Sequence, residues 1–151
     1  MKFNLEIVIE KPIAEVIEKF DSSENLKHWQ PGFISMDHFE GVPGEVGAKS
    51  KLKYKMGKRE VEMVETITVK NLPAEFSGTY VTGKMWNEIK NYFESTSDGN
   101  TRYKSQHTFK IQGFLKLVGW IMPGAFKKES MKYLTHFKNY VETGASVEEN
   151  H

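Results

Sequence analysis

Two titratable residues of this sequence, His107 and Glu65, have the side-chain types best suited to chemistry. An imidazole titrates near neutral pH, so it can give or take a proton there. A carboxylate set among apolar side chains can act beside it as an acid or a base around a bound carbonyl compound. Glu65 stands between Met63 and Ile67, and His107 stands in the alternating segment 103–111. Whether the pair is catalytic depends on the elements that hold it.

Three interpretations of His107 are open on the sequence alone. It is a hydrogen-bonded structural histidine, a polar anchor for a ligand headgroup, or a catalytic acid or base. Burial without a charged partner would lower its pKa, because burial disfavours the charged form. An inward Glu65 is costly unless it is hydrogen-bonded, paired or beside water, so it would indicate a wet, partly polar cavity. A register error of one residue would place Glu65 outside instead.

Other catalytic and metal-binding patterns are not recognisable. The chain has no cysteine, which removes disulfides, thiolate metal sites and cysteine nucleophiles. His28, His38 and His136 lack a partner at helical ligand spacing, so we predict no metal and no cofactor. The glycine-rich run 41–47 lacks the lysine and helix start of a phosphate-binding loop, and it is typical of a turn between strands.

Composition indicates one globular domain. The chain has 151 residues, of which 38% are hydrophobic and 27% charged, and its net charge is +1. That balance supports a packed core and gives no electrostatic reason to expect nucleic acid as a partner. The lysines at alternate positions in 49–55 are best explained as a solvated, partly paired outer face. We predict one ligand-binding domain, residues 1–144, and a flexible tail, residues 145–151.

Targeting signals are not visible. Residues 1–10 alternate between apolar and polar types, unlike a signal peptide, and the apolar stretch 113–126 is interrupted by Lys116 and Pro123. We therefore expect a cytoplasmic protein with no integral membrane segment. The sequence leaves its oligomeric state open between monomer and dimer.

Periodicity predicts the elements. Alternation over residues 3–9 predicts a first strand, and Pro12 precedes a helical pattern through Phe20. A second short helix is expected to end at Pro31-Gly32, followed by strands and turns as far as residue 112. Helical spacing then returns, and a long amphipathic helix is expected to end near Gly144.

Turns set the register of the predicted sheet. A two-residue turn at Gly57-Lys58 pairs Lys55 with Glu60 and puts Glu65 on the inner face. A turn at Gly83-Lys84 pairs Tyr80 with Asn87. A three-residue loop at 98–100 would set Asn91 opposite His107, both facing inward. In this register Trp86 lies on the outer face.

The order of elements favours an α+β fold, with a curved antiparallel sheet of about six to seven strands around a long C-terminal helix and two short helices after the first strand. Pro12 with Val16 and Phe20, Trp29 with Pro31, the run 41–47, residues 98–101 and the closing helix with Leu134 and Phe137 carry a resemblance. The chain resembles the helix-grip fold of the SRPBCC (START and Bet v 1-like) superfamily, in its polyketide cyclase/dehydrase and lipid-transport branch. The resemblance implies a ligand cavity between the sheet and the C-terminal helix.

The function predicted from these residues is binding or transport of a small hydrophobic or amphipathic, lipid-like or polyketide-like molecule. The first alternative is a cofactor-independent cyclase, dehydratase or isomerase that uses His107 and Glu65. The second is a protein-interaction module similar to the chaperone-activating branch of the same superfamily. The predicted ligand-binding residues are Leu52, Tyr54, Met63, Glu65, Phe76, Tyr80, Asn87, Asn91, His107, Phe109, Met122, Phe126, Ser130, Leu134 and Phe137.

Overall fold

A single antiparallel sheet of seven strands forms one layer of the structure, a computed structural model that describes residues 1–111 and 123–148. The strand order is β1-β7-β6-β5-β4-β3-β2, so β1 and β2 form the two edges. The strands are β1 (Lys2–Ile9), β2 (Phe33–Glu40), β3 (Lys49–Met56), β4 (Arg59–Asn71), β5 (Glu75–Thr82), β6 (Met85–Ser95) and β7 (Thr101–Ile111).

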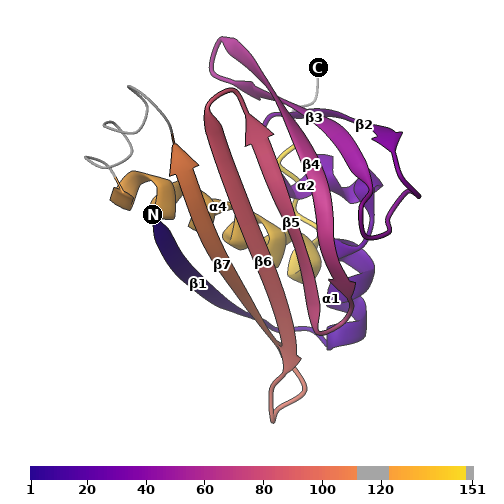
Figure 1. Cartoon of the computed structure of the whole chain (residues 1–151). Helices are drawn as coiled ribbons and strands as arrows, with labels where there is room; N and C mark the ends of the chain where they lie inside the picture. Colours follow the sequence, from indigo (N-terminus) through magenta and orange to yellow (C-terminus); the bar gives the residue numbers. More distant parts are fainter. Residues whose placement is uncertain (112–122, 149–151) are drawn as a thin grey trace.

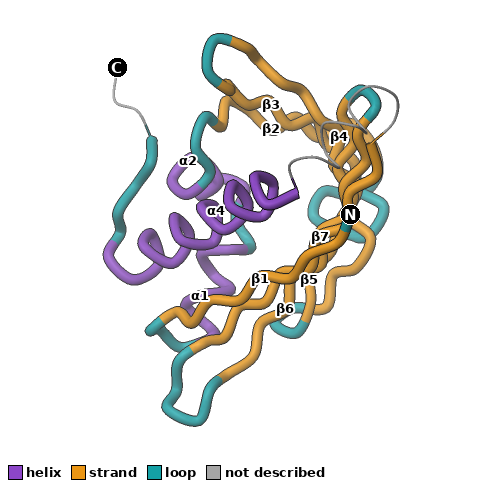
Figure 2. Tube along the Cα trace, turned by 90° about the vertical axis from the view of Figure 1, so that its left-hand side faces the viewer, coloured by secondary structure: helices purple, strands orange, loops and turns teal. Residues whose placement is uncertain are grey.

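The helices lie on one side of this sheet. They are α1 (Ile13–Phe20), the 3-10 turn η1 (Ser23–Asn25), α2 (Leu26–Trp29) and α4 (Pro123–Thr143). The sheet bends around α4, which lies across its concave side, while α1 and α2 lie beside α4 on the same side of the sheet (Figures 1 and 2). This arrangement confirms the predicted α+β architecture.

Local sequence explains the first elements. Leu5 and Ile9 are buried and Val8 is exposed, as the alternation predicts. Pro12 has extended backbone and precedes Ile13, because its fixed φ and missing N–H suit a helix start. Val16 is the fully buried residue of α1.

The predicted register is confirmed for the β3–β4 and β5–β6 hairpins. The turn at Gly57-Lys58 pairs Lys55 with Glu60, and the turn at Gly83-Lys84 pairs Tyr80 with Asn87. Glu65 lies between Ser50 of β3 and Tyr80 of β5, so the inward placement of this carboxylate is also confirmed. Its neighbours on both sides are inner-face residues.

The register of the β6–β7 hairpin differs from the prediction by two residues. Asn91 pairs with Ser105, and His107 pairs with Ile89. The loop spans residues 96–100 because Thr96 closes it: its N–H donates to the Asn100 carbonyl at 2.9 Å, and its hydroxyl accepts from the Asn100 N–H at 3.1 Å. A shift of two residues keeps every side chain on its predicted face.

The hydrophobic core occupies one end of the concave face. Its central side chain is Phe137 of α4, which is fully buried and makes edge contacts with Phe20, Trp29 and Tyr103 at ring-centroid distances of 5.7, 5.0 and 5.8 Å. The other buried members are Leu5, Ile9, Val16, Phe93, Leu134 and Val141. The rest of the concave face lies outside this cluster.

The end of α4 agrees with the prediction. Gly144 has φ +77° and donates its N–H to the Tyr140 carbonyl, a helix stop that favours glycine. Beyond it, the Val147 N–H donates to the His28 carbonyl at 2.9 Å. The flexible tail and the domain boundary at residue 144 stay predictions. No helix within residues 1–111 and 123–148 is long and apolar enough to cross a membrane.

Candidate functional site

The half of the concave face away from the core is lined by inward side chains that remain half-buried. We call this region the open half. Its residues are Val61, Met63 and Glu65 of β4, Tyr80 of β5, Met85, Asn87 and Ile89 of β6, and Phe126, Ser130 and Tyr133 of α4. By contrast, the inward residues of the core end are almost all closed to solvent. In this half of the concave face, apolar side chains therefore surround a few polar ones.

A row of polar side chains crosses the open half. Glu65 is the cross-strand neighbour of Tyr80, and Tyr80 is the cross-strand neighbour of Asn87. Ser50 of β3 extends the row at one end and Phe109 of β7 ends it at the other. Side chains in such a row stand on adjacent strands and within reach of one another.

Burial dominates the electrostatics of this row. It raises the pKa of the Glu65 carboxyl, while the Tyr80 hydroxyl, which donates a hydrogen bond to it, partly lowers that pKa. Burial and the neighbouring Glu65 charge raise the pKa of the Tyr80 phenol well above its ordinary value. Burial therefore disfavours the charged form of both groups, although each side chain keeps part of its surface accessible.

Tyr54 adds a second phenol beside the row. Its hydroxyl donates to Gln30 Oε1 at 2.6 Å, and burial raises the pKa of the phenol, with Tyr133 and Glu65 adding to the rise. Gln30 comes from the turn between α2 and β2, and Tyr133 from α4. The polar part of the open half is therefore assembled from the sheet, the turn after α2 and the closing helix.

His107 lies buried beside the open half. Its ring stacks on Phe3 at 4.8 Å between centroids, and its Nε2 lies 2.7 Å from the Ser105 hydroxyl. Its Nδ1 is buried without a hydrogen-bond partner. Burial lowers the pKa of the imidazole to about 4, so the ring is neutral near pH 7. The Ser105 contact favours the structural interpretation, and the unpartnered Nδ1 leaves one ring atom for a ligand.

The two inward asparagines differ in what they leave unpaired. Asn91 is satisfied: its Nδ2 donates to the Phe76 carbonyl at 3.2 Å, and its Oδ1 accepts from the Tyr103 hydroxyl at 2.6 Å. Asn87 Oδ1 is buried without a partner. An unpaired buried acceptor is costly, so Asn87 is the asparagine prepared to meet a ligand donor.

Glu65 and His107 are far apart in the sheet. They lie on β4 and β7, with β5 and β6 between them. Three strand spacings correspond to about 14 Å before sheet curvature is considered. The two groups are thus not a directly interacting acid–base pair.

The remaining predicted ligand-binding residues fall into three groups. Leu52, Tyr54 and Phe109 are buried inward residues next to the open half, and Phe109 meets Phe126 at 5.3 Å between ring centroids. Phe76 contacts Phe20 of the core end, and Leu134 and Phe137 belong to the packed core. Met122 lies outside the described residues.

Sequence reasoning missed Gln30 and Tyr133. Tyr133 follows Phe126 and Ser130 at spacings of seven and three residues, so the same helical stripe could have identified it. Gln30 lies in a turn without periodicity, and no pattern indicates that it faces Tyr54.

Positive charges on the described strands lie outside this region. Lys53 pairs with Glu62 on the outer face at 3.9 Å, and Lys110 lies over the Trp86 ring at 4.9 Å. Lys70 pairs with Asp21 at the core end at 3.7 Å. Within residues 1–111 and 124–148, no Lys or Arg side chain belongs to the open half. Among these residues no cluster of three or more metal-ligating side chains occurs either.

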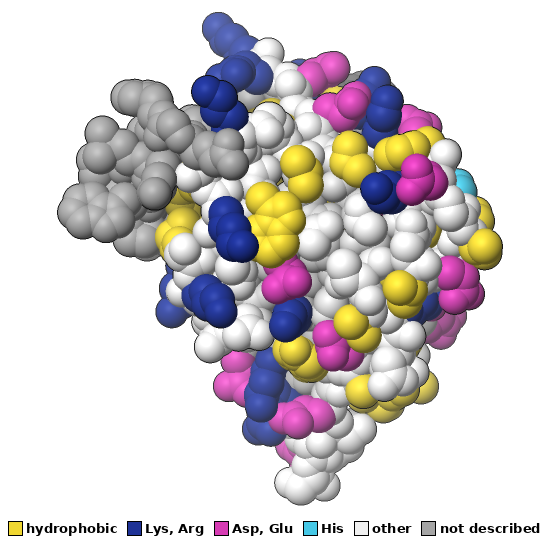
Figure 3. Space-filling model, viewed as in Figure 1, with side chains coloured by type: hydrophobic (Ala, Val, Ile, Leu, Met, Phe, Trp, Pro, Cys, Tyr) yellow, Lys and Arg dark blue, Asp and Glu magenta, His cyan; other side chains and the backbone are white. Residues whose placement is uncertain are grey.

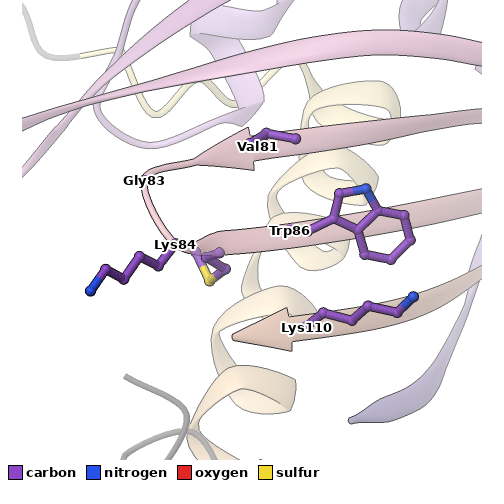
Figure 4. Close-up of a pocket in the computed structure, with 6 residues that line it drawn as sticks. Val81, Gly83, Lys84, Trp86 and Lys110 are labelled. Atoms are coloured by element: carbon purple, nitrogen blue, oxygen red, sulfur yellow. The ribbon is translucent and has the colours of Figure 1, made fainter. Parts of the chain in front are cut away.

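A shallow hollow lies on the outer face of the sheet. It has a volume of about 360 Å³ and is lined by Val81, Gly83, Lys84, Met85, Trp86 and Lys110. Trp86 and Lys110 lie side by side on adjacent strands, which confirms the outward indole (Figure 4). Elsewhere this face mixes both charge signs with separated apolar side chains (Figure 3). The hollow is open, so it encloses little of any ligand.

The burial of His107 predicts a pH effect on stability. Between about pH 6.5 and about pH 4 the unfolded chain binds a proton at this histidine that the folded protein excludes. The free energy of unfolding therefore falls with falling pH by about 1.4 kcal/mol per pH unit from this group. We expect wild type to lose about 2–3 kcal/mol more than His107→Gln between pH 7 and pH 4.5 in denaturant titrations.

The matched control for this effect is His38→Gln, because His38 is exposed on β2. This variant should keep the wild-type pH dependence. Taking the difference between variants also cancels the opposite contribution of Glu65, whose pKa is raised by burial. Parallel curves for wild type and His107→Gln would contradict a buried, neutral His107.

Comparisons with known proteins identify the fold. No protein-family model matches the chain, and no curated protein matches its sequence. Among solved structures, Ara h 8.0201 is similar with a TM-score of 0.75 and 19% identity over 93% of this chain and 97% of that one. A conserved protein from Geobacillus kaustophilus has a TM-score of 0.76 and 15% identity over 93% and 95% of the two chains.

A third similar structure is the Zhui aromatase/cyclase from Streptomyces sp. R1128. Its TM-score is 0.76 with 8% identity, over 97% of this chain and 99% of that one. At these identities the likeness shows the fold alone. The chain has the helix-grip fold, as the order of its elements predicted.

Proposed function

We propose that this protein binds a small hydrophobic or amphipathic molecule in the open half, between the sheet and α4. One observation carries the proposal: Glu65, Tyr80 and Asn87 lie deep between sheet and helix, yet part of their surface is not covered by protein. A residue set that mixes several apolar side chains with a few convergent polar ones is what small-molecule sites have in common.

Apolar burial supplies most of the affinity in this proposal. Met63, Met85, Ile89 and Phe126 offer apolar surface on two sides of the site. Each Å² of ligand hydrocarbon removed from water contributes about 25 cal/mol. Methionine side chains adapt to irregular shapes, which suits a flexible chain or a flat ring system. The polar row then orients the ligand.

Binding accounts for this arrangement better than acid–base catalysis does. Catalysis by Glu65 and His107 requires both groups to reach one reacting centre. The register separates their strands by about 14 Å, and His107 is neutral and bonded to Ser105. The name of the Zhui neighbour points toward a cyclase, but that name belongs to a chain with 8% identity. A protein-interaction module would require a filled concave face, which the half-buried row opposes.

Filling the open half tests the proposal. Ser130 of α4 is half-buried on the stripe that faces the sheet. We expect Ser130→Phe to lower the affinity for Nile red, a neutral apolar fluorescent probe, at least tenfold, because the added ring takes the volume that the probe needs. Fluorescence titration of purified wild type and variant measures this.

The control for that variant is Asn139→Phe. Asn139 is exposed on the same helix, so the same kind of ring is added where no ligand is proposed. Its Nile red affinity should equal that of wild type, and both variants should melt cooperatively. Equal affinities for all three proteins would show that the probe binds elsewhere and would overturn the proposal.

A further inference from the structure

The open half offers acceptors more than donors. The Glu65 carboxylate accepts the Tyr80 hydrogen bond and has further lone pairs free, and Asn87 Oδ1 is buried without a donor. The Tyr80 hydroxyl, while it donates to Glu65, can still accept. The Asn87 NH2 group adds donors to the row, but among the described residues Asn87 Oδ1 has no donor to accept from, and a ligand with a donor group would satisfy it.

Among residues 1–111 and 124–148, no Lys or Arg side chain belongs to this region to receive an anion. The described lysines of β3 and β7 point outward, and Lys70 is paired with Asp21 at the other end of the sheet. Lys127 and Lys128 of α4 are exposed. A carboxylate or phosphate placed beside Glu65 would meet a like charge in a weakly solvated site.

His107, at the edge of the polar row, independently indicates that a ligand group forms a hydrogen bond there. It is more than nine-tenths buried, and Phe109, two residues along β7, ends the row opposite Asn87. Its Nδ1 has no partner. With its Nε2 engaged by Ser105, the neutral ring leaves one nitrogen to complete a hydrogen bond with a ligand group.

We propose that the natural ligand is an amphiphile whose polar end donates hydrogen bonds, an alcohol, a phenol or a protonated amine, and that fatty acids and other anionic amphiphiles are excluded. This inference rests on the proposed function, because it names the chemical class of the molecule in the open half. The donor group lies against the row Glu65, Tyr80 and Asn87, and the apolar part lies between Met63 and Phe126.

Matched ligands of one chain length test the inference. Nile red bound to the protein is displaced at pH 7 by 1-decanol, decylamine or decanoate, which differ only at the headgroup. We expect 1-decanol and decylamine to displace the probe at concentrations at least tenfold lower than decanoate. A preference for decylamine over 1-decanol would indicate a cationic headgroup in the natural ligand. A preference for 1-decanol over decylamine would indicate a neutral hydrogen-bond donor.

Glu65→Gln identifies the group responsible. Removal of the charge should reduce the advantage of decylamine over decanoate at least fivefold, because both the attraction and the repulsion are lost. Glu62→Gln is the control, since Glu62 is an exposed carboxylate on the outer face of the same strand. If Glu65→Gln does not fold, the wild-type headgroup preference decides the question without it.

The failures of the two proposals are distinguishable. Absence of Nile red binding and of binding by all three decyl compounds would overturn the proposed function itself. Binding in which decanoate equals or exceeds the other two would overturn the present inference and leave the proposed function standing.

Discussion

Phe137→Ala is expected to destabilise the protein by about 4 kcal/mol. The ring of Phe137 is fully buried and forms edge contacts with Phe20 of α1, Trp29 of α2 and Tyr103 of β7, so truncation leaves a cavity that these three elements cannot move together to fill. The side chain anchors α4 to the sheet and to α1 and α2. Denaturant unfolding at pH 7 measures the change as a fall in the free energy of unfolding.

The control for this substitution is Phe39→Ala. Phe39 is 49% exposed on the edge strand β2, so its truncation should change the free energy of unfolding by less than about 1 kcal/mol. A cost for Phe137→Ala near that of Phe39→Ala would mean that α4 is not anchored at the core end. In that case α4 would not hold its residues of the open half in a fixed position against the sheet.

Gly32→Ala is expected to destabilise the protein by about 3–5 kcal/mol. Gly32 has φ +77°, and a Cβ there would overlap the Lys55 carbonyl oxygen. The same approach forms the hydrogen bond from the Lys55 N–H to the Gly32 carbonyl at 2.7 Å. Adding a methyl group must therefore push β2 away from β3, and it displaces Gln30 from Tyr54. Thermal and denaturant unfolding of the variant measure the loss.

Gly57→Ala separates conformational strain from this overlap. Gly57 also has positive φ, at +65°, but a Cβ there meets nothing within 4 Å. Its cost should be about 1–2 kcal/mol, the cost of placing a side chain in the left-handed region. Equal costs for the two glycines would show that the contact between Gly32 and Lys55 does not hold β2 in place.

The fold could be predicted because local signals agreed with one another. Alternation in β1, the turns at Gly57 and Gly83, and charge pairs such as Lys55 with Glu60 all fix the same sheet faces. The predicted register of the β6–β7 hairpin was wrong by two residues. Thr96 closes a longer loop than predicted, through hydrogen bonds that residue types alone do not specify. The inward or outward direction of each side chain was still predicted correctly in this hairpin, because a register shift of two residues leaves every side chain on the same face of the sheet.

The site was less predictable than the fold. Period-two alternation tells which side chains face inward, and Glu65, Tyr80 and Asn87 were found in this way. Alternation does not tell where the core ends, so Leu134 and Phe137 were grouped with residues of the open half. The distance between Glu65 and His107 is set by the order of the strands in the sheet, which periodicity does not reveal. Gln30 contacts Tyr54 from a turn, where the sequence has no periodic pattern.

Native mass spectrometry of the purified protein, compared with its denatured mass and with an organic extract, tests the central claim most directly. Ligand binding between sheet and α4 predicts a reproducible added mass that disappears on denaturation, and an extract containing an alcohol, phenol or amine with a sizeable apolar part. A protein that carries no added mass, and that also takes up neither Nile red nor the decyl compounds, would contradict the claim that the open half is a binding site.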